Sequence, residues 1–284
     1  MFVVLEDLPE QPAARLKALR AFMGQLPGAV VAYSGGVDST LVAAIAAEQL
    51  GARAIAVTGV SPALAPHLRQ EAATQAHWLG IRHREISTAE LDEPAYSNNP
   101  SDRCYACKRE LHLRLTAQLP QLAPGATVVV DGVNQDDLAD HRPGITAAKE
   151  RGVRSPLAEL GISKADVRHI SRALGFPWWD KPAQPCLASR FPYGEPISAS
   201  RLQRVAAAEA WLLQRGFREV RVRSQGDAAR IEVGADQLDE ALGLWRDPQE
   251  RQRLISHFLE LGFTAVGVDL EGLVSGKLNR SLSS

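Results

Sequence analysis

The chain has 284 residues, of which 45% are hydrophobic and 23% charged, and its formal net charge is −1. These values fit one large or two ordinary globular domains, exclude an intrinsically disordered chain, and give no global attraction to nucleic acid or membranes. No apolar run approaches the ~20 residues that span a bilayer, and the acidic start "MFVVLEDLPE" does not fit a signal peptide. We therefore expect a cytoplasmic protein.

Helix and strand patterns alternate through the first half of the chain. Apolar residues at helical spacing predict helices over residues 13–26, 38–51, 64–80 and 108–119. Short apolar runs predict strands over residues 28–34, 52–59, 83–88 and 126–132. Such alternation predicts an α/β fold with a doubly wound parallel sheet.

The pattern changes between Phe176 and Pro196, where proline and aromatic residues are dense. This composition excludes a regular helix and predicts an ordered connector. Beyond it the sequence predicts helices over 198–216 and 247–262 and strands over 218–224, 229–234 and 263–270. We therefore expect three parts: a main domain over 1–175, the connector over 176–196, and a smaller α+β domain for substrate binding or oligomerisation over 197–284.

The motif "YSGGVDST" at residues 33–40 joins the first predicted strand to a helix. Gly35 and Gly36 lack Cβ atoms, so the backbone can approach an anion, and the N–H groups and dipole of a helix N-terminus favour its charge. Asp38 is expected to orient the loop or to help hold Mg²⁺. The Walker A and G-x-G-x-x-G patterns are absent. A tight turn with a Ser or Asp cap is the alternative.

Two of the three cysteines, Cys104 and Cys107, lie two residues apart, and the third, Cys186, lies in the connector. An odd number of cysteines argues against a disulfide framework and favours metal binding or thiol chemistry. The spacing lets two thiolates reach one metal or cluster, and Cys186 could join them if the connector folds back over the sheet edge. A buried or redox-active pair is the alternative for the first two.

Charged residues mark a possible anion site in the second half. Arg221 and Arg223 alternate in a predicted strand and so share one face, which suits an anionic ligand or forms an exposed basic face. Arg190 is a candidate for the same task because its guanidinium fork matches phosphate and carboxylate. Weaker candidates for metal, ATP or substrate contacts are Asp131, Asn134, Asp137, Glu209 and Glu232.

The string "SGGVDS" resembles the PP-loop of the N-type ATP pyrophosphatase superfamily, whose members adenylate a substrate oxygen and release pyrophosphate. The stretches "RCYACKRELH", "DGVNQDDLADHRPG", "VRSPL" and "PCLASRFPYG" together resemble the LarE family, which are ATP-dependent sulfur transferases of nickel-pincer cofactor synthesis. The match runs from the loop to the "VRVR" strand, which is most of the chain.

This resemblance implies a reaction and its partners. The carboxylates of pyridinium-3,5-biscarboxylic acid mononucleotide would be adenylated with ATP and Mg²⁺ and converted to thiocarboxylates, for the cofactor of lactate racemase-type enzymes. Sulfide or another donor would supply the sulfur. The resemblance further implies a homo-oligomer of unspecified size, with no membrane partner and no nucleic acid.

The family has two sulfur sources. One branch sacrifices the sulfur of a single cysteine on the "CLASR" segment and leaves dehydroalanine, whereas the other has three cysteines that resemble the ligands of a [4Fe–4S] cluster. This chain has all three, which favours a cluster that carries hydrosulfide on its open iron. Zinc with an open fourth position fits three cysteines equally well by count.

The residues expected to act follow from the loop and the resemblance. The predicted ATP-binding residues are Ser34, Gly35, Gly36, Asp38, Ser39, Thr40 and Thr58. The predicted substrate-binding residues are Lys108, Arg190, Arg221 and Arg223. The predicted catalytic residues are Asp38, Lys108 and the cysteines Cys104, Cys107 and Cys186, which are also the predicted cluster ligands.

Two other functions use the same features. A tRNA thiolase has the same loop and should carry an RNA-binding domain or a basic patch; the net charge of −1 and the absence of an obvious RNA-binding module disfavour it. A regulatory protein that binds ATP and a structural zinc would not release pyrophosphate.

Overall fold

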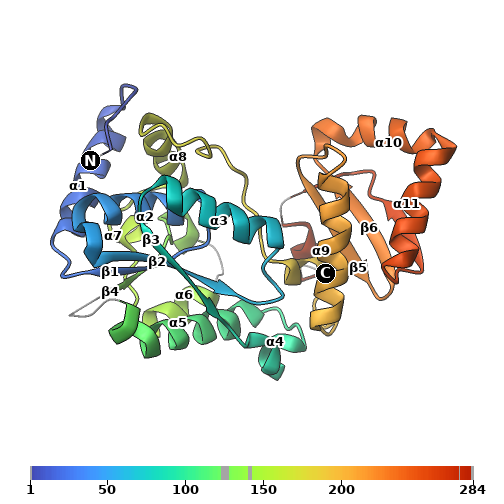
Figure 1. The fold of residues 1–284 in the computed structure, drawn as a ribbon, viewed down its shortest axis with the longest axis horizontal. Helices are drawn as coiled ribbons and strands as arrows, with labels where there is room; N and C mark the ends of the chain where they lie inside the picture. The colour runs from blue at the N-terminus through green and yellow to red at the C-terminus, as the bar shows by residue number, and fades with distance from the viewer. Residues whose placement is uncertain (1, 123–127, 140–142, 275, 283–284) are drawn as a thin grey trace. The chain divides into compact units, whose positions relative to one another are not determined.

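The computed structural model describes residues 2–122, 128–139, 143–274 and 276–282, which fall into two compact units (Figure 1). The first unit contains Met1–Ser61, Pro66–Glu90 and Asp102–Gln184. The second contains Pro62–Ala65, Leu91–Ser101 and Pro185–Ser284.

The first unit holds four strands, β1 (Ala29–Ala32), β2 (Ala54–Val60), β3 (Arg82–Ser87) and β4 (Val128–Val130). Its helices are α1 (Glu10–Gly24), α2 (Val37–Leu50), η1 (Gly51–Arg53), α3 (Pro66–Trp78), α5 (Arg103–Leu122), η3 (Asp136–Leu138), α6 (Pro143–Glu150), α7 (Pro156–Glu159) and α8 (Lys164–Ala173). The short helix η2 (Glu90–Asp92) spans a boundary between the units along the chain.

The second unit holds the strands β5 (Val220–Gln225), β6 (Ala228–Val233) and β7 (Ala265–Val268). Its helices are α4 (Pro94–Ser97), η4 (Leu187–Arg190), α9 (Ala199–Leu213), η5 (Ala235–Gln237), α10 (Leu238–Arg246), α11 (Pro248–Glu260) and η6 (Lys277–Leu282). Each helix and strand that the sequence predicts has a counterpart here. Helix α5 begins at Arg103, however, so Cys104 and Cys107 lie on it rather than before it. Residues 126 and 127 of the predicted fourth strand lie outside the described residues.

The sheet of the first unit is parallel, in the order β3-β2-β1-β4. Strand β1 is buried along its whole length, which explains its uninterrupted apolar sequence. Alternate residues of the strands face two cores. Val31 belongs to one core together with side chains of α1, α2, α3 and α8, whereas Val30 belongs to the other together with Leu115 of α5 and Ala148 of α6. Figure 1 shows these helices on the two faces of the sheet. Helices therefore cover both faces, and the predicted doubly wound α/β fold is confirmed.

The strand order places the glycine loop at a special position. Strands β2 and β3 lie on one side of β1 and β4 lies on the other, so the order reverses between β1 and β4. In open α/β sheets, ligands bind outside the carboxyl ends of the strands at such a reversal. Residues 33–36 follow β1 and Asp131 follows β4, so both meet at this position.

The second unit is the smaller α+β part that the sequence predicts. Strand β6 pairs with β5 in antiparallel and with β7 in parallel orientation, while α9 packs against β5 and α11 against β7. Val222 and Ile231 are cross-strand partners and fully buried. The opposite face of the same two strands carries the charged pairs Arg221–Glu232 and Arg223–Arg230.

The boundary between the units falls inside the predicted connector, between Gln184 and Pro185. Two earlier segments join the second unit, which the sequence did not predict. The backbone N–H groups of Leu187 and Gly194 donate to the carbonyl oxygens of Ala63 and Asn99, at 2.9 and 2.8 Å. These hydrogen bonds order the irregular segment that carries Cys186. Among the helices of the described residues, none is both long and apolar enough to cross a membrane.

Candidate functional site

The glycine loop after β1 packs closely against α3. Gly35 has a φ of +71°, and a Cβ atom there would lie 3.0 Å from the Cβ atom of Ala72. Both the left-handed backbone and the close approach therefore require glycine. Gly36 has an extended backbone with φ −76° and is the N-cap residue of α2. The two glycines thus differ: Gly35 shapes the loop, and Gly36 opens the helix.

The loop hydroxyls stabilise the turn from within. Ser34 Oγ accepts a hydrogen bond from the Gly36 N–H at 3.3 Å, and Ser39 Oγ donates to the Gly36 carbonyl oxygen at 3.1 Å. The hydroxyl oxygens of Ser34 and Ser39 lie 3.1 Å apart. The first N–H groups of α2 have no helix carbonyl to bind, and the helix dipole is positive there. The arrangement can receive an anion such as pyrophosphate.

Two hydroxyls predicted to bind ATP are turned into the protein instead. Thr40 is fully buried and donates to Gln75 Oε1 at 3.2 Å, an oxygen that also accepts from the Tyr33 hydroxyl. Burial raises the pKa of that tyrosine to about 12. Thr58 is buried as well, with its hydroxyl oxygen 2.9 Å from His83 Nε2. In this structure Thr40 and Thr58 support the loop from behind and do not line it.

Asp38 is the second residue of α2 and is held by two partners from distant parts of the sequence. Lys164 Nζ lies 2.6 Å from its Oδ2 atom, and Asn134 Nδ2 donates to Oδ1 at 3.0 Å. Asn134 is itself fixed, because its side-chain oxygen accepts from the backbone N–H groups of Asp136 and Asp137. The carboxylate remains partly exposed. Its position is therefore fixed beside the loop, and a carboxylate fits a Mg²⁺ ligand by its chemistry.

Lys164 and Gly132 are site residues that sequence reasoning missed. Lys164 is the first residue of α8, inside the capping box that Ser163 and Asp166 form, and nothing in its local sequence points to Asp38. A Cβ atom on Gly132 would lie 2.6 Å from the Ser39 backbone nitrogen, so only glycine allows the segment after β4 to reach α2. The signal for Gly132 was its place at the end of a predicted strand.

Lys108 lies beside the buried carboxyl group of Asp131 at the carboxyl end of β4. Burial raises the pKa of Asp131, and the positive charge of Lys108 opposes this shift. A Cβ atom on Gly144 would lie 2.8 Å from Lys108 Cγ, so α6 confines the lysine stem. Lys108 thus belongs to the same sheet edge as the loop, which is where a phosphate or substrate contact is expected.

The three cysteines are divided between the units. Cys104 and Cys107 lie one turn apart at the start of α5 in the first unit, and Cys186 precedes η4 in the second. Cys104 and Cys186 are exposed and Cys107 is half-buried. Within the parts of the chain that the structure describes, no three His, Cys, Asp or Glu side chains come close enough to hold a metal ion. The [4Fe–4S] cluster therefore stays a prediction.

A buried ion pair fixes the segment that carries Cys186. Arg190 donates from Nε and Nη2 to the two carboxylate oxygens of Glu209, at 2.7 and 3.0 Å. Its Nη1 atom donates to the Pro185 carbonyl oxygen at 3.0 Å and to the Ser189 hydroxyl at 2.9 Å. Most of the donor capacity of Arg190 is therefore used within the protein. The structure gives this arginine an anchoring role that the sequence did not predict.

Arg223 supports the same segment from β5. It donates from Nε and Nη2 to Glu232 Oε2 at 2.9 and 2.7 Å, and from Nη1 to the Ser189 carbonyl oxygen at 2.7 Å. Glu232 is fully buried. The weak candidates Glu209 and Glu232 are thus the counter-ions of two predicted substrate ligands.

Arg221 differs from these two arginines. No hydrogen bond or ion pair joins its guanidinium group to any other described residue, and it is only half-buried. Burial lowers its pKa, and the nearby positive charges of Arg190 and Arg223 lower it further. A cation in such surroundings is stabilised by an incoming anion. Arg221 is therefore the strongest candidate among the predicted substrate ligands of the second unit.

We expect Arg221→Gln and Arg223→Gln to have different effects. The first should raise the KM for an anionic substrate about tenfold or more without loss of stability, because a charge-assisted contact contributes roughly 1.5–3 kcal/mol. The second should cost roughly 3 kcal/mol of unfolding free energy, because it removes the main partner of the buried Glu232. Steady-state kinetics and urea unfolding measure the two quantities. Equal loss of stability in both variants would contradict the distinction.

The strand–loop–helix unit at the sheet reversal, with Asp38 fixed beside it, defines an ATP-utilising enzyme of the PP-loop class. The comparisons with known proteins agree. The NAD synthase family matches residues 20–111. Over 272 residues the chain is 35% identical to the pyridinium-3,5-bisthiocarboxylic acid mononucleotide synthase of Lactiplantibacillus plantarum, with 95% of this chain and 96% of that protein covered. The chain therefore belongs to the LarE family.

Two further relatives extend over similar lengths. The uncharacterized protein slr1717 of Synechocystis is 54% identical over 275 residues, which cover 95% of this chain and 98% of that protein. The uncharacterized protein MJ0830 of Methanocaldococcus jannaschii is 29% identical over 242 residues, which cover 85% of this chain and 89% of that protein.

Proposed function

We propose that this chain is an ATP-dependent sulfur transferase that converts the carboxylates of pyridinium-3,5-biscarboxylic acid mononucleotide to thiocarboxylates. The observation that carries the proposal is the similarity to the Lactiplantibacillus plantarum synthase along nearly the full length of both chains. The glycine loop, Asp38 and Lys108 at one sheet edge are the parts that such a reaction needs in the first unit.

The proposed reaction has two steps. A substrate carboxylate oxygen attacks the α-phosphorus of ATP, the bond between the α-phosphorus and its bridging oxygen breaks, and pyrophosphate leaves. Hydrosulfide then attacks the acyl carbon, the bond to the AMP oxygen breaks, and the thiocarboxylate forms. Activation is needed because a carboxylate oxygen is a poor leaving group, whereas AMP is a good one.

The chain's own residues would bind and orient the reactants. The N–H groups at the start of α2 would hold the departing pyrophosphate, with the loop shape maintained by Gly35. Asp38, positioned by Lys164 and Asn134, would be a ligand of Mg²⁺, which when bound would offset the phosphate charge. Arg221 would bind an anionic group of the mononucleotide.

We further propose that Cys104, Cys107 and Cys186 are the three ligands of a [4Fe–4S] cluster. Three thiols, two exposed and one half-buried, fit this donor set, and the N-terminal position of the first two on α5 favours the thiolate form. When bound, a cluster with one iron open would supply hydrosulfide without consuming the protein. A homo-oligomer also remains part of the prediction.

Mass spectrometry and a pyrophosphate assay test the proposal together. With ATP, Mg²⁺, sulfide and the dicarboxylate mononucleotide, we expect pyrophosphate release that depends on the mononucleotide and a product in which oxygen is exchanged for sulfur. Pyrophosphate release with tRNA and none with the mononucleotide would favour a tRNA thiolase. ATP binding without pyrophosphate release under either condition would favour a nucleotide-binding regulator.

A further inference from the structure

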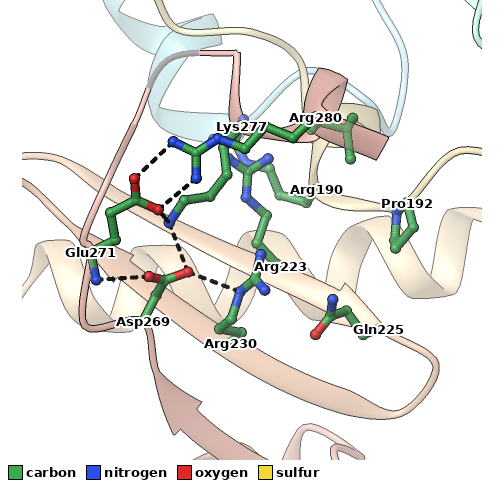
Figure 2. A pocket seen from close by; sticks show the side chains of 10 residues that line it. Arg190, Pro192, Arg223, Gln225, Arg230, Asp269, Glu271, Lys277 and Arg280 are labelled. Carbon is green, nitrogen blue, oxygen red and sulfur yellow. Dashed lines mark hydrogen bonds and ion pairs between the residues drawn. The ribbon is translucent and has the colours of Figure 1, made fainter. Parts of the chain in front are cut away.

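The second unit contains a pocket of about 370 Å³ lined mainly by charged side chains (Figure 2). Arg190 reaches it from η4, Arg223 from β5 and Arg230 from β6. Lys277 and Arg280 reach it from η6, near the end of the described chain. The volume lies within the range of small-ligand sites.

The pocket carries more positive than negative charge. Glu209 and Glu232 neutralise Arg190 and Arg223 through the buried ion pairs already described. On the remaining lining, Asp269 and Glu271 offset only part of the charge of Arg230, Lys277 and Arg280. The chain as a whole has a formal charge of −1, so this excess is local. Arg221, which lies near Arg190 and Arg223, increases it.

The carboxylate of Glu271 holds the two cations of η6. Arg280 Nη1 and Nη2 each lie 2.8 Å from one of its oxygens, and Lys277 Nζ lies 3.1 Å from Oε2 (Figure 2). The hydrogen bonds from Arg280 and then Lys277 lower the pKa of Glu271 to about 2. Glu271 is exposed, so water competes for the contact and its hold on the cations is weak.

Lys277 connects this exposed pair with the interior of the pocket. Its side chain is only 10% exposed, and Nζ lies 2.8 Å from Asp269 Oδ2. Asp269 in turn contacts Arg230 Nε at 3.3 Å. One amino group thus faces both the rim acid Glu271 and the inner acid Asp269. An anion that replaced Glu271 would meet two preset cations, a guanidinium fork and an ammonium group, which match phosphate oxygens.

We propose that Lys277 and Arg280 bind the phosphate group of the mononucleotide and that Glu271 occupies this position until the phosphate displaces it. The inference rests on the proposed function for the identity of the nucleotide. A phosphate monoester carries between one and two negative charges at neutral pH and so matches the local excess of positive charge. Helix η6 is then a determinant of specificity for the phosphorylated substrate over its riboside.

Calorimetric titration of the full chain tests the proposal with two ligands, the dicarboxylate mononucleotide and the matching riboside that lacks phosphate. We expect Lys277→Gln and Arg280→Gln each to weaken mononucleotide binding about tenfold or more and to leave riboside binding unchanged. Glu271→Gln should strengthen mononucleotide binding severalfold, because the competing carboxylate is gone. The matched control is Arg253→Gln on α11, whose guanidinium pairs with Glu250 outside the pocket.

Several outcomes would overturn the proposal. One is an equal loss of affinity for both ligands in the Lys277 and Arg280 variants, and another is unchanged mononucleotide affinity in these variants. A third is weaker rather than stronger mononucleotide binding by Glu271→Gln, which is the result expected if the ion pair is purely structural. Titration with inorganic phosphate separates this inference from the proposed function. If the wild type binds neither pyridinium compound but binds phosphate in a Lys277-dependent manner, the pocket assignment stands and the proposed substrate is wrong. If the wild type thiolates the mononucleotide while Lys277→Gln binds it normally, the proposed function stands and the pocket assignment is wrong.

Discussion

Asp38→Asn is expected to lower the rate of pyrophosphate release by roughly a hundredfold to a thousandfold, the size of effect seen when one preorganised group that stabilises developing charge is removed. The change keeps the side-chain shape but removes the negative charge that faces Lys164 and that would hold Mg²⁺. The fold should remain intact, because the carboxylate is partly exposed. The measurement is a coupled pyrophosphate assay at saturating ATP and Mg²⁺, with a thermal melt of each variant.

A double-mutant cycle makes this prediction sharper. If Lys164 acts by positioning Asp38, then Lys164→Gln should be slow, and adding it to Asp38→Asn should cause little further loss. The matched control is Glu85→Gln, which breaks the exposed ion pair between Glu85 and Arg69 and should keep the wild-type rate. A near-normal rate in Asp38→Asn would remove Asp38 from the site, whereas fully additive losses in the double variant would contradict the positioning role of Lys164.

The sequence predicted the fold because its signals are local. Apolar periodicity identifies a helix or strand from its own residues, and the uninterrupted run of β1 reflects burial on both faces. The position of the glycine loop follows from the same local signals, because a glycine pair between a predicted strand and a predicted helix must lie in the turn that joins them. The sequence did not give the order of the strands. Only the structure shows that β1 and β4 flank the reversal and that the loop therefore lies at it.

The finer roles within the loop depended on contacts that sequence does not display. Both glycines looked equivalent, yet only Gly35 has a positive φ and only its position is closed by Ala72. The hydroxyls also looked equivalent, but helical phase turns Thr40 toward Gln75 while Ser39 faces Ser34. Substituting Gly36, whose φ is −76°, would therefore not create the backbone strain that a positive φ would bring.

The arginines illustrate how pairing across a sheet changes a prediction. Alternation in β5 correctly placed Arg221 and Arg223 on one face, but the register with β6 puts Glu232 beside them. Arg223 takes the carboxylate, and Arg221 lacks a partner among the described residues. The lysine and arginine of η6 carried no signal at all, because the acids that reveal their role, Asp269 and Glu271, contact them only in the folded unit.

The sulfur source is decided by the cysteines. If Cys104, Cys107 and Cys186 hold a [4Fe–4S] cluster, anaerobically purified protein should contain about four irons per chain, and replacing any one cysteine with serine should remove most of the iron, because two thiolates hold a cubane poorly. Serine costs little stability at Cys104 and Cys186, whose side chains are exposed. Added sulfide should then support more than one turnover, and mass spectrometry should find Cys186 intact.

The sacrificial route predicts the opposite on every readout. Each chain would deliver one sulfur, Cys186 would lose the mass of one H₂S as it became dehydroalanine, and serine at position 104 or 107 would be tolerated. Zinc in place of iron, with the metal retained through turnover, would assign the three thiolates to a different metal. Stoichiometric loss at Cys186 in active protein that contains no iron would end the cluster hypothesis, yet it would leave the sulfur transfer itself in place, because the loop and Asp38 activate the carboxylate whichever atom supplies the sulfur.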